Sequence, residues 1–391
     1  MAAALVWCPD KQELMMKLYR TPHRFIFIFI FILLQQLASG VAWSADSIAP
    51  KQKLLFVTLQ GGGAQIASID ADGSHELVLT TGPGENTQAA WSPDGQRIVF
   101  TSSRGGAAPQ IYLMNADGSQ QTRLTEHALP NDSATWSPDG QRIAFRSYRD
   151  RKAALYSMAV DGTQLRQLTT AESDKGNIHW SPDGRQIAYE VYGDKGSVEF
   201  HVMKADGADD RDVSSALNKY KKTQLSWSPD SSKLMFVSID AYHETHIHVV
   251  SPDGSRAVQI TQLPFINTQP VWSPDGRRIA FVSNRTGGSI GRSAGDIFLM
   301  NADGSGVVNL TRHPANDDEP KWSVDGRTLF FLSMRNGPPQ LHAIDLEGGP
   351  ARRLTTHTGQ DLMYDVAPVE SVPGKSRLAA VNQPHQASIS N

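Results

Sequence analysis

The sequence predicts an all-β protein, a β-propeller of seven four-stranded blades, from one motif and two shorter marks that recur along the chain. The motif is Trp-Ser-Pro-Asp-Gly, or a close variant of it, and it occurs six times at intervals of 44 to 50 residues. A fixed period near 45 with strand signals inside each unit is typical of propeller blades. We expect the six tryptophans to pack between blades: Trp91, Trp136, Trp180, Trp227, Trp272 and Trp322.

Two shorter marks set the number of blades. Outside the Trp motif, an acidic residue followed by glycine occurs seven times, from Asp72-Gly73 to Glu347-Gly348. Soon after each of these pairs comes an apolar residue followed by Thr or Ser, again seven times, from Leu79-Thr80 to Leu354-Thr355. Asp-Gly between alternating apolar runs is a strong hairpin signal, because glycine adopts the positive φ that the turn needs. Both counts predict seven blades, and six is the alternative if the last unit is not a blade.

The chain begins in the middle of a blade, so the seventh inner strand must come from the C-terminus. The first strands are expected near residues 53–59, 65–70 and 76–80, and the last near 363–369. In our alignment Glu370 takes the place of the missing tryptophan, and residues 372–374 replace Pro-Asp-Gly. Strands from both termini would then close the ring and leave no long open sheet edge.

The N-terminus has the pattern of an export signal. Lys17, Arg20 and Arg24 precede an apolar run at residues 25–34, and small residues follow at 38–42. This run is too short to span a membrane as a helix and is typical of a cleaved signal peptide, although a retained anchor stays open. We predict a signal peptide at 1–45, a linker at 46–51, the propeller at 52–382 and a tail at 383–391. Translation could equally start at Met15 or Met16.

Charge and cysteine content exclude several classes of function. Cys8 is the only cysteine and lies in the predicted signal, so the exported chain would have no disulfide and no thiol nucleophile. Removing residues 1–45 leaves 37 − 4 = 33 Lys and Arg against 40 − 2 = 38 Asp and Glu, a net charge of −5. This balance disfavours nucleic acid as a partner. We expect a periplasmic or secreted monomer with no membrane span after cleavage.

The repeat resembles the TolB-type propeller repeat. The similarity is carried by residues 91–100 (Trp-Ser-Pro-Asp-Gly-x-x-Ile-x-Phe), by 111–118 and by Leu124-Thr125, and it extends over about 52–382. The resemblance implies a periplasmic protein of the Tol-Pal type, whose partner is a peptidoglycan-associated lipoprotein. TolB proteins carry an α/β domain before a six-bladed propeller, whereas few residues here separate the predicted cleavage site from the first strand. The chain is therefore expected to be TolB-like, without that N-terminal domain.

We placed the candidate binding site at the mouth of the central channel, on the end opposite the repeated turns. The loops at that end differ between blades, and irregular loops on a rigid frame often bind ligands. Two hypotheses stay open. The residues could be solvated loop ends that keep the channel wet, or they could form a mouth with acidic residues on one side and basic residues on the other that holds an extended peptide or sugar chain. The candidate residues precede each Trp position: Asn86, Asn131, Lys175, Lys222, Asn267, Asp317, Asp318, Glu319 and Asp365.

No motif in the chain predicts a catalytic residue, a metal ligand or a cofactor. The Gly-x-Ser-x-Gly match at 287–291 lies in a loop and lacks the strand-turn-helix that a nucleophile elbow needs. His246 and His248 would share one side of a strand, but His248 occupies a ring-shaped packing position that recurs in other blades. The strings of the type Asp-x-Asp-Gly, such as 70–73, lack the rest of a calcium loop.

The sequence therefore favours a non-enzymatic module that binds a protein or glycan in the bacterial cell envelope. The alternative is a propeller lyase acting on acidic oligosaccharides, of the oligogalacturonate-lyase type, which the resemblance links to a metal held by channel histidines. Among the expected inner strands only His179 could contribute to such a cluster. A third possibility is the propeller of a prolyl-oligopeptidase-type enzyme, but the hydrolase domain that performs the chemistry in such enzymes is not expected in this sequence.

Overall fold

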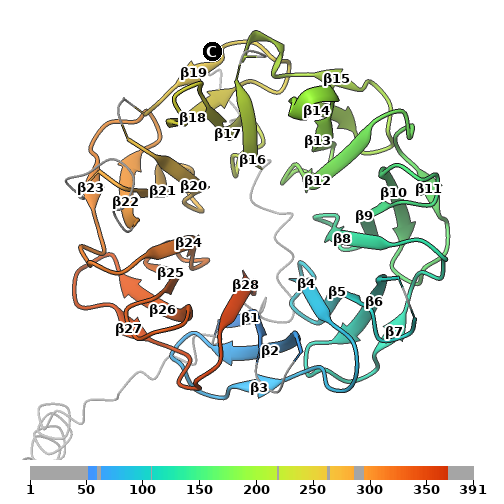
Figure 1. Cartoon of the computed structure of the whole chain (residues 1–391), viewed down its shortest axis with the longest axis horizontal. Helices are drawn as coiled ribbons and strands as arrows, with labels where there is room; N and C mark the ends of the chain where they lie inside the picture. Colours follow the sequence, from blue (N-terminus) through green and yellow to red (C-terminus); the bar gives the residue numbers. More distant parts are fainter. Residues whose placement is uncertain are drawn as a thin grey trace, which may run out of the picture. The chain divides into compact units, whose positions relative to one another are not determined.

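The computed structural model describes residues 52–59, 63–106, 108–217, 220–261, 265–285 and 295–368, which lie in one compact unit, Lys51–Asn391. These residues form seven four-stranded antiparallel sheets arranged in a ring, as predicted (Figure 1). The predicted signal peptide, linker and tail lie outside the described residues. Among the residues that are described, no helix has the length and apolar character needed to cross a membrane.

Each blade has an inner strand at the channel, two central strands and a two-residue outer strand. We number the blades 1 to 7 from the sheet that contains β4, so that blade 7 holds β28, β1, β2 and β3. The inner strands are β4 (Asn86–Trp91), β8 (Asn131–Trp136), β12 (Asp174–Trp180), β16 (Lys221–Trp227), β20 (Asn267–Trp272), β24 (Asp317–Trp322) and β28 (Asp361–Val366). The second strands are β1 (Lys53–Thr58), β5 (Arg97–Ser102), β9 (Arg142–Ser147), β13 (Gln186–Tyr192), β17 (Leu234–Ile239), β21 (Arg278–Ser283) and β25 (Thr328–Ser333).

The third strands are β2 (Gln65–Asp70), β6 (Gln110–Asn115), β10 (Ala154–Ala159), β14 (Val198–Lys204), β18 (Thr245–Val250), β22 (Asp296–Asn301) and β26 (Gln340–Asp345). The outer strands are β3 (Leu77–Val78), β7 (Thr122–Arg123), β11 (Arg166–Gln167), β15 (Arg211–Asp212), β19 (Val258–Gln259), β23 (Val308–Asn309) and β27 (Arg352–Arg353). Two short 3-10 turns, η1 (Asp194–Gly196) and η2 (Ser215–Leu217), lie in blades 3 and 4.

The ring is closed by strands from the two ends of the propeller, as expected. The C-terminal strand β28 pairs antiparallel with β1, from Leu54 opposite Val366 to Thr58 opposite Asp361. The expected alignment of this blade was wrong by four residues, however. Val366 is the residue that corresponds to Trp91, since Trp91 lies opposite Ile98 and Ile98 is the counterpart of Leu54.

This correction moves Asp365 from the first position of its inner strand to the fifth. The first position is Asp361, and Glu370 lies outside the described residues. The error arose because the last blade has lost the aromatic residue and the turn motif that mark the register in the other six. A short Pro-Val match then aligned the wrong residues.

The Trp-Ser-Pro-Asp-Gly motif is a turn held by its own side chains. In blade 1 the Ser92 hydroxyl donates to Asp94 and accepts the Arg97 N–H at 2.9 Å, and Gly95 has a φ of 69°. This turn also contacts the Asp-Gly turn of the same blade, because the Ala116 N–H donates to the Gln96 carbonyl at 2.9 Å. Both repeated turns therefore lie on one end of the ring, as predicted.

The two shorter marks meet across the blade boundary. In all seven units the Thr or Ser hydroxyl accepts an N–H from the third strand, as Thr80 does from Ile66 at 2.9 Å. In six of the seven units the apolar residue before it packs on the turn glycine of the next blade; Gly348 of blade 6 is the exception. At Gly304, with a φ of 87°, an added Cβ would lie 2.2 Å from the Ile260 carbonyl oxygen. Glycine is needed there both for its conformation and for close approach.

The core is divided into clusters that span neighbouring blades. Trp136 of blade 2 packs with Val99 and Ile111 of blade 1, and its indole N–H donates to the Ala90 carbonyl at 3.2 Å. Trp227 and Trp322 donate in the same way to the preceding blade. Each of these three tryptophans thus contacts the preceding blade through its ring and its indole N–H.

Candidate functional site

Six of the nine predicted mouth residues are buried inside the blades and do not line an open mouth. Each is 6% exposed or less, and its polar head bonds a group of the blade or of the adjoining loop. In blade 6, Asp317 accepts two bonds from Arg335, at 2.8 and 3.0 Å. The placement of these six side chains at the mouth was therefore wrong: Asn86, Asn131, Lys175, Lys222, Asn267 and Asp317.

An unrecognised arginine motif explains why the first position is buried. An arginine follows the tryptophan by 13 residues in blades 1, 2, 5 and 6: Arg104, Arg149, Arg285 and Arg335. In three of these blades its guanidinium bonds the first inner-strand residue. Blades 3 and 4 have Gly193 and Asp240 at that position, and their inner strands supply Lys175 and Lys222 instead. The spacing is a sequence signal that could have revealed these structural pairs.

A β-bulge in every inner strand turns the third residue towards the channel. The pairing register with the second strand shifts at this point in all seven blades. Gln88, for example, has a φ of 51°, and its side-chain oxygen accepts the N–H of Ser133 in the next blade at 2.9 Å. Bulges of this kind re-aim side chains and often mark functional sites.

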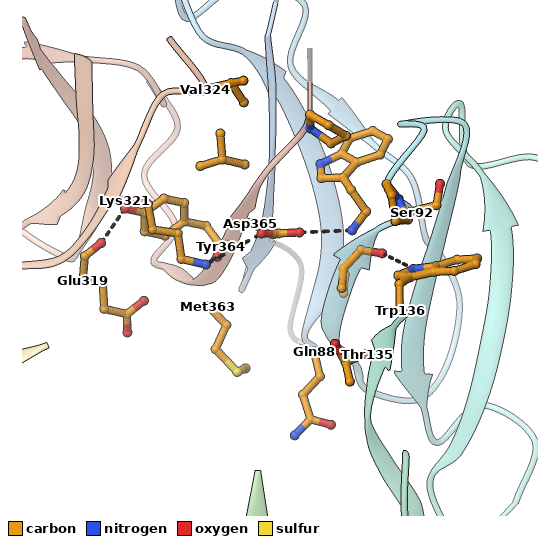
Figure 2. A pocket seen from close by; sticks show the side chains of 16 residues that line it. Gln88, Ser92, Thr135, Trp136, Glu319, Lys321, Val324, Met363, Tyr364 and Asp365 are labelled. Atoms are coloured by element: carbon orange, nitrogen blue, oxygen red, sulfur yellow. Dashed lines mark hydrogen bonds and ion pairs between the residues drawn. The ribbon is translucent and has the colours of Figure 1, made fainter. Parts of the chain in front are cut away.

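The inner strands of blades 6, 7, 1 and 2 line an open cavity of about 750 Å³ (Figure 2). It extends from the bulged third residues to the Ser-Pro turns, and therefore towards the end opposite the one we predicted. Of the nine predicted residues, Glu319 and Asp365 line it. The other polar or channel-facing members labelled in Figure 2 include Gln88, Thr135, Lys321, Met363 and Tyr364.

One wall of the cavity is a linked set of charged and aromatic side chains. Lys321 lies 4.0 Å from Asp365 and 4.9 Å from the centre of the Tyr364 ring, and its ammonium donates to the Tyr364 carbonyl. The Asp365 carboxylate accepts the backbone N–H of Trp91 at 3.0 Å and so connects blade 7 to blade 1. The Tyr364 hydroxyl donates to the backbone carbonyl of Glu319. These contacts fix the wall in place before any ligand binds.

Negative charge is in excess at this wall. Burial and the neighbouring Glu319 raise the pKa of Asp318 to about 6, although a hydrogen bond from Asn316 opposes the shift. Burial also raises the pKa of Glu319, while Lys321 opposes that shift. Raised carboxyl pKa values mean that the charged forms lack full compensation. A cationic group bound beside them would supply it.

The described inner strands do not form the histidine cluster that a metal-dependent lyase would need. His179 is the one histidine in these seven strands; burial lowers its pKa, and its backbone carbonyl accepts the Trp227 indole N–H at 2.9 Å. His248 has the packing role we expected. It stacks on Phe236 at 5.4 Å, and burial lowers its pKa to about 4.

Sequence reasoning missed Lys321, Tyr364 and Met363. Lys321 stands at the fifth inner-strand position, where the five preceding blades have alanine, threonine, histidine, serine and valine, so it is the first lysine or carboxylate in that series. Comparison of that position between blades could have found it. Tyr364 and Met363 were hidden by the four-residue misalignment of the last blade.

Known proteins support the fold assignment. A family model described as the TolB beta propeller domain matches residues 6–176, 107–223, 179–291 and 289–390. No curated protein matches the chain. Among solved structures, TolB from Acinetobacter baumannii is 17% identical with a TM-score of 0.50, and the match covers 78% of this chain and 79% of that one.

Two enzymes also share the propeller. An oligogalacturonate lyase in complex with manganese is 16% identical with a TM-score of 0.61, and the match covers 80% of this chain and 87% of the lyase. A puromycin hydrolase is 17% identical with a TM-score of 0.62, and the match covers 79% of this chain and 54% of the hydrolase. This chain thus spans about half of the hydrolase. At these identities the similarity establishes the fold alone, because propellers carry many unrelated functions.

Proposed function

The chain belongs to the TolB beta propeller domain family, and on this premise we propose that it is an exported, non-enzymatic binding protein of the bacterial cell envelope. Export is supported by the basic, apolar and small-residue pattern of residues 1–45. A periplasmic location and a role in a Tol-Pal-type system would fit this family. The proposed ligand is a basic segment of a protein partner, with a hydroxyl-rich glycan as the alternative.

The observation that carries this proposal is the carboxylate wall of the channel cavity. Glu319 and Asp365 line a volume large enough for a side chain or a short peptide segment, and Asp318 lies next to Glu319. Among the described residues that line the cavity, Lys321 is the single cation. A basic group entering the cavity would meet the Glu319 carboxylate, whose pKa burial raises because its charged form is incompletely compensated.

A binding role is favoured over catalysis by what the cavity contains. Its lining, as far as the structure describes the chain, includes no histidine and no cysteine, and the Tyr364 hydroxyl bonds backbone carbonyls. An acidic oligosaccharide would also be repelled by the carboxylate wall. Incubation with oligogalacturonate should therefore give no unsaturated product, and such a product would support the lyase instead.

Neutralising the wall should weaken partner capture while the fold is kept. We expect a tagged full chain carrying Glu319→Gln and Asp365→Asn to capture envelope proteins more slowly than wild type and with less dependence on salt. Both substitutions preserve shape, and the asparagine can still accept the Trp91 N–H. The matched control is Glu126→Gln with Glu347→Gln, which removes two exposed carboxylates that do not line the cavity.

The acidity of Asp318 adds a pH dependence to the same assay. Its pKa of about 6 means that the side chain loses its charge as the pH falls through 6, so capture of a basic partner should weaken between pH 7 and pH 5. The proposal fails if the control pair reduces capture as much as the cavity pair at equal folded fraction. It also fails if neither pair affects a partner that wild type retains.

A further inference from the structure

The hairpin between β17 and β18 of blade 4 gathers two carboxylates and one imidazole outside the channel site. Asp240, Glu244 and His246 place one potential ligand atom each within 4.8 Å of one another. The two carboxylates come from the turn and the histidine from the second residue of β18. Among the described residues, this is the one group of three or more His, Cys, Asp or Glu side chains whose ligand atoms lie close enough together to share a metal ion.

His246 is a buried imidazole without the hydrogen bonds that burial normally requires. The residue is 4% exposed, and its Nδ1 has no hydrogen-bond partner within the described residues. Its Nε2 faces Asp240 Oδ2 at 3.8 Å, which is too long for a hydrogen bond. Buried polar atoms are nearly always satisfied, so an unpaired imidazole directed at a carboxylate calls for an explanation.

Comparison between blades shows that histidine is exceptional at this position. The equivalent residue is Gln65 in blade 7, Gln110 in blade 1 and Gln340 in blade 6. In blade 1 the Gln110 oxygen accepts bonds from Thr125 and Asn131, and so ties the crossover to the next blade. In blade 4 the Thr245 hydroxyl makes the link to the next blade instead: it donates to the Asn267 carbonyl at 2.8 Å and accepts the Asn267 N–H at 2.6 Å. The side chain at position 246 is therefore not needed for this link.

A second exception coincides with the first. Asp240 stands 13 residues after Trp227, where four other blades have arginine. The arginine would repel a cation at this turn, whereas the aspartate attracts one. Asp240 Oδ1 accepts the N–H groups of Tyr242 and Glu244, at 2.8 and 3.0 Å, and these bonds leave Oδ2 directed at His246.

We propose that Asp240, Glu244 and His246 form a binding site for a divalent transition-metal ion of the Zn²⁺ type. Imidazole nitrogen and carboxylate oxygen are both zinc ligands, with metal–ligand bonds of about 2.0–2.2 Å, and three protein ligands leave a fourth position open to water. Those bond lengths would bring the ligand atoms to roughly 3.4 Å from one another. Rotation of the half-buried Glu244 side chain can provide this contraction. An imidazole ligand disfavours calcium and magnesium, which prefer oxygen.

The site is tested by metal titration of the full, tag-free chain after treatment with chelator. We expect wild type to bind one Zn²⁺ with an affinity clearly above that of His246→Gln, by more than about tenfold, because a ligand is lost. The glutamine is the residue that three other blades use at this position, so the fold should be retained. Thermal unfolding without metal checks that the variant is folded.

Two further variants make the result decisive. His201→Gln removes another imidazole beside two carboxylates, whose Nδ1 already bonds Asp210 at 3.1 Å, and should leave Zn²⁺ binding unchanged. Asp240→Asn should weaken binding as His246→Gln does. With Co²⁺ as the probe, the visible absorption of the bound ion should change in His246→Gln and stay as in wild type in His201→Gln. Equal Zn²⁺ binding by wild type and His246→Gln, or loss of binding in His201→Gln, would overturn the proposal.

Discussion

Ending the chain after Thr356 should abolish cooperative folding of the ring, which is the largest effect we expect. The truncation removes β28 and leaves β1 with an unpaired edge. It also removes Tyr364, which is 3% exposed and packs with Leu54 and Phe56, and it takes away the Asp365 carboxylate that accepts the Trp91 N–H. The loss should be comparable with the whole stability of a typical domain, roughly 5–15 kcal/mol.

Circular dichroism during chemical denaturation, together with the soluble yield, measures this effect. The matched control ends after Asn382, the predicted end of the propeller, and should unfold like the full chain. An exposed sheet edge also predicts aggregation of the shorter protein alone. A soluble chain ending at Thr356 that unfolds in one transition at the wild-type midpoint would contradict closure by β28.

Trp136→Ala should destabilise the protein by about 3–5 kcal/mol, the usual cost of removing a large buried aromatic ring. The indole is 6% exposed and fills the boundary between blades 1 and 2. The substitution also removes the hydrogen bond to the Ala90 carbonyl and the ring under the Arg97 guanidinium, 5.3 Å away. The paired strands on both sides cannot collapse far into the gap.

Trp180→Ala separates the effect of losing a buried ring from the effect of changing the tryptophan of the repeat motif. Trp180 occupies the same repeat position, but it is only half-buried and its indole N–H has no partner among the described residues. The loss of unfolding free energy in denaturant should therefore be smaller than for Trp136→Ala. Equal losses, or a loss below about 1 kcal/mol at Trp136, would show that the tryptophans do not hold the blades together as we describe.

The blades could be predicted because each recurring residue has a local structural task. Thr80 and its counterparts accept a third-strand N–H, Ser92 and Asp94 close the turn, and Gly304 allows one blade to approach the next. These tasks depend on neighbours at fixed sequence spacing. A repeat therefore records them directly, and the strand order and the end that carries the turns follow from it.

The cavity could not be predicted in the same way, because it depends on side-chain direction. Inner-strand position one was expected at the channel, but the bulge two residues later turns Gln88 and Glu319 there and leaves Asn86 and Asp317 inside the sheet. The residue type does not predict the left-handed conformation at the third position, because glutamine, serine, glutamate and methionine all adopt it there. Arg104, whose guanidinium donates a hydrogen bond to the Asn86 side chain, lies 18 residues away in the sequence. In the sequence this contact is reflected only in the constant spacing between the tryptophan and the arginine.

Site-specific photo-crosslinking from the channel wall tests the central claim, that the partner binds in the channel, most directly. A photo-reactive amino acid at Met363, which is 45% exposed and lines the cavity without carrying charge, should crosslink the envelope partner. The same group at Leu77, which is 51% exposed on the outer strand β3, is the control. We predict a crosslinked product from position 363 that disappears with Glu319→Gln and Asp365→Asn. A product from position 77 and none from position 363 would contradict binding in the channel.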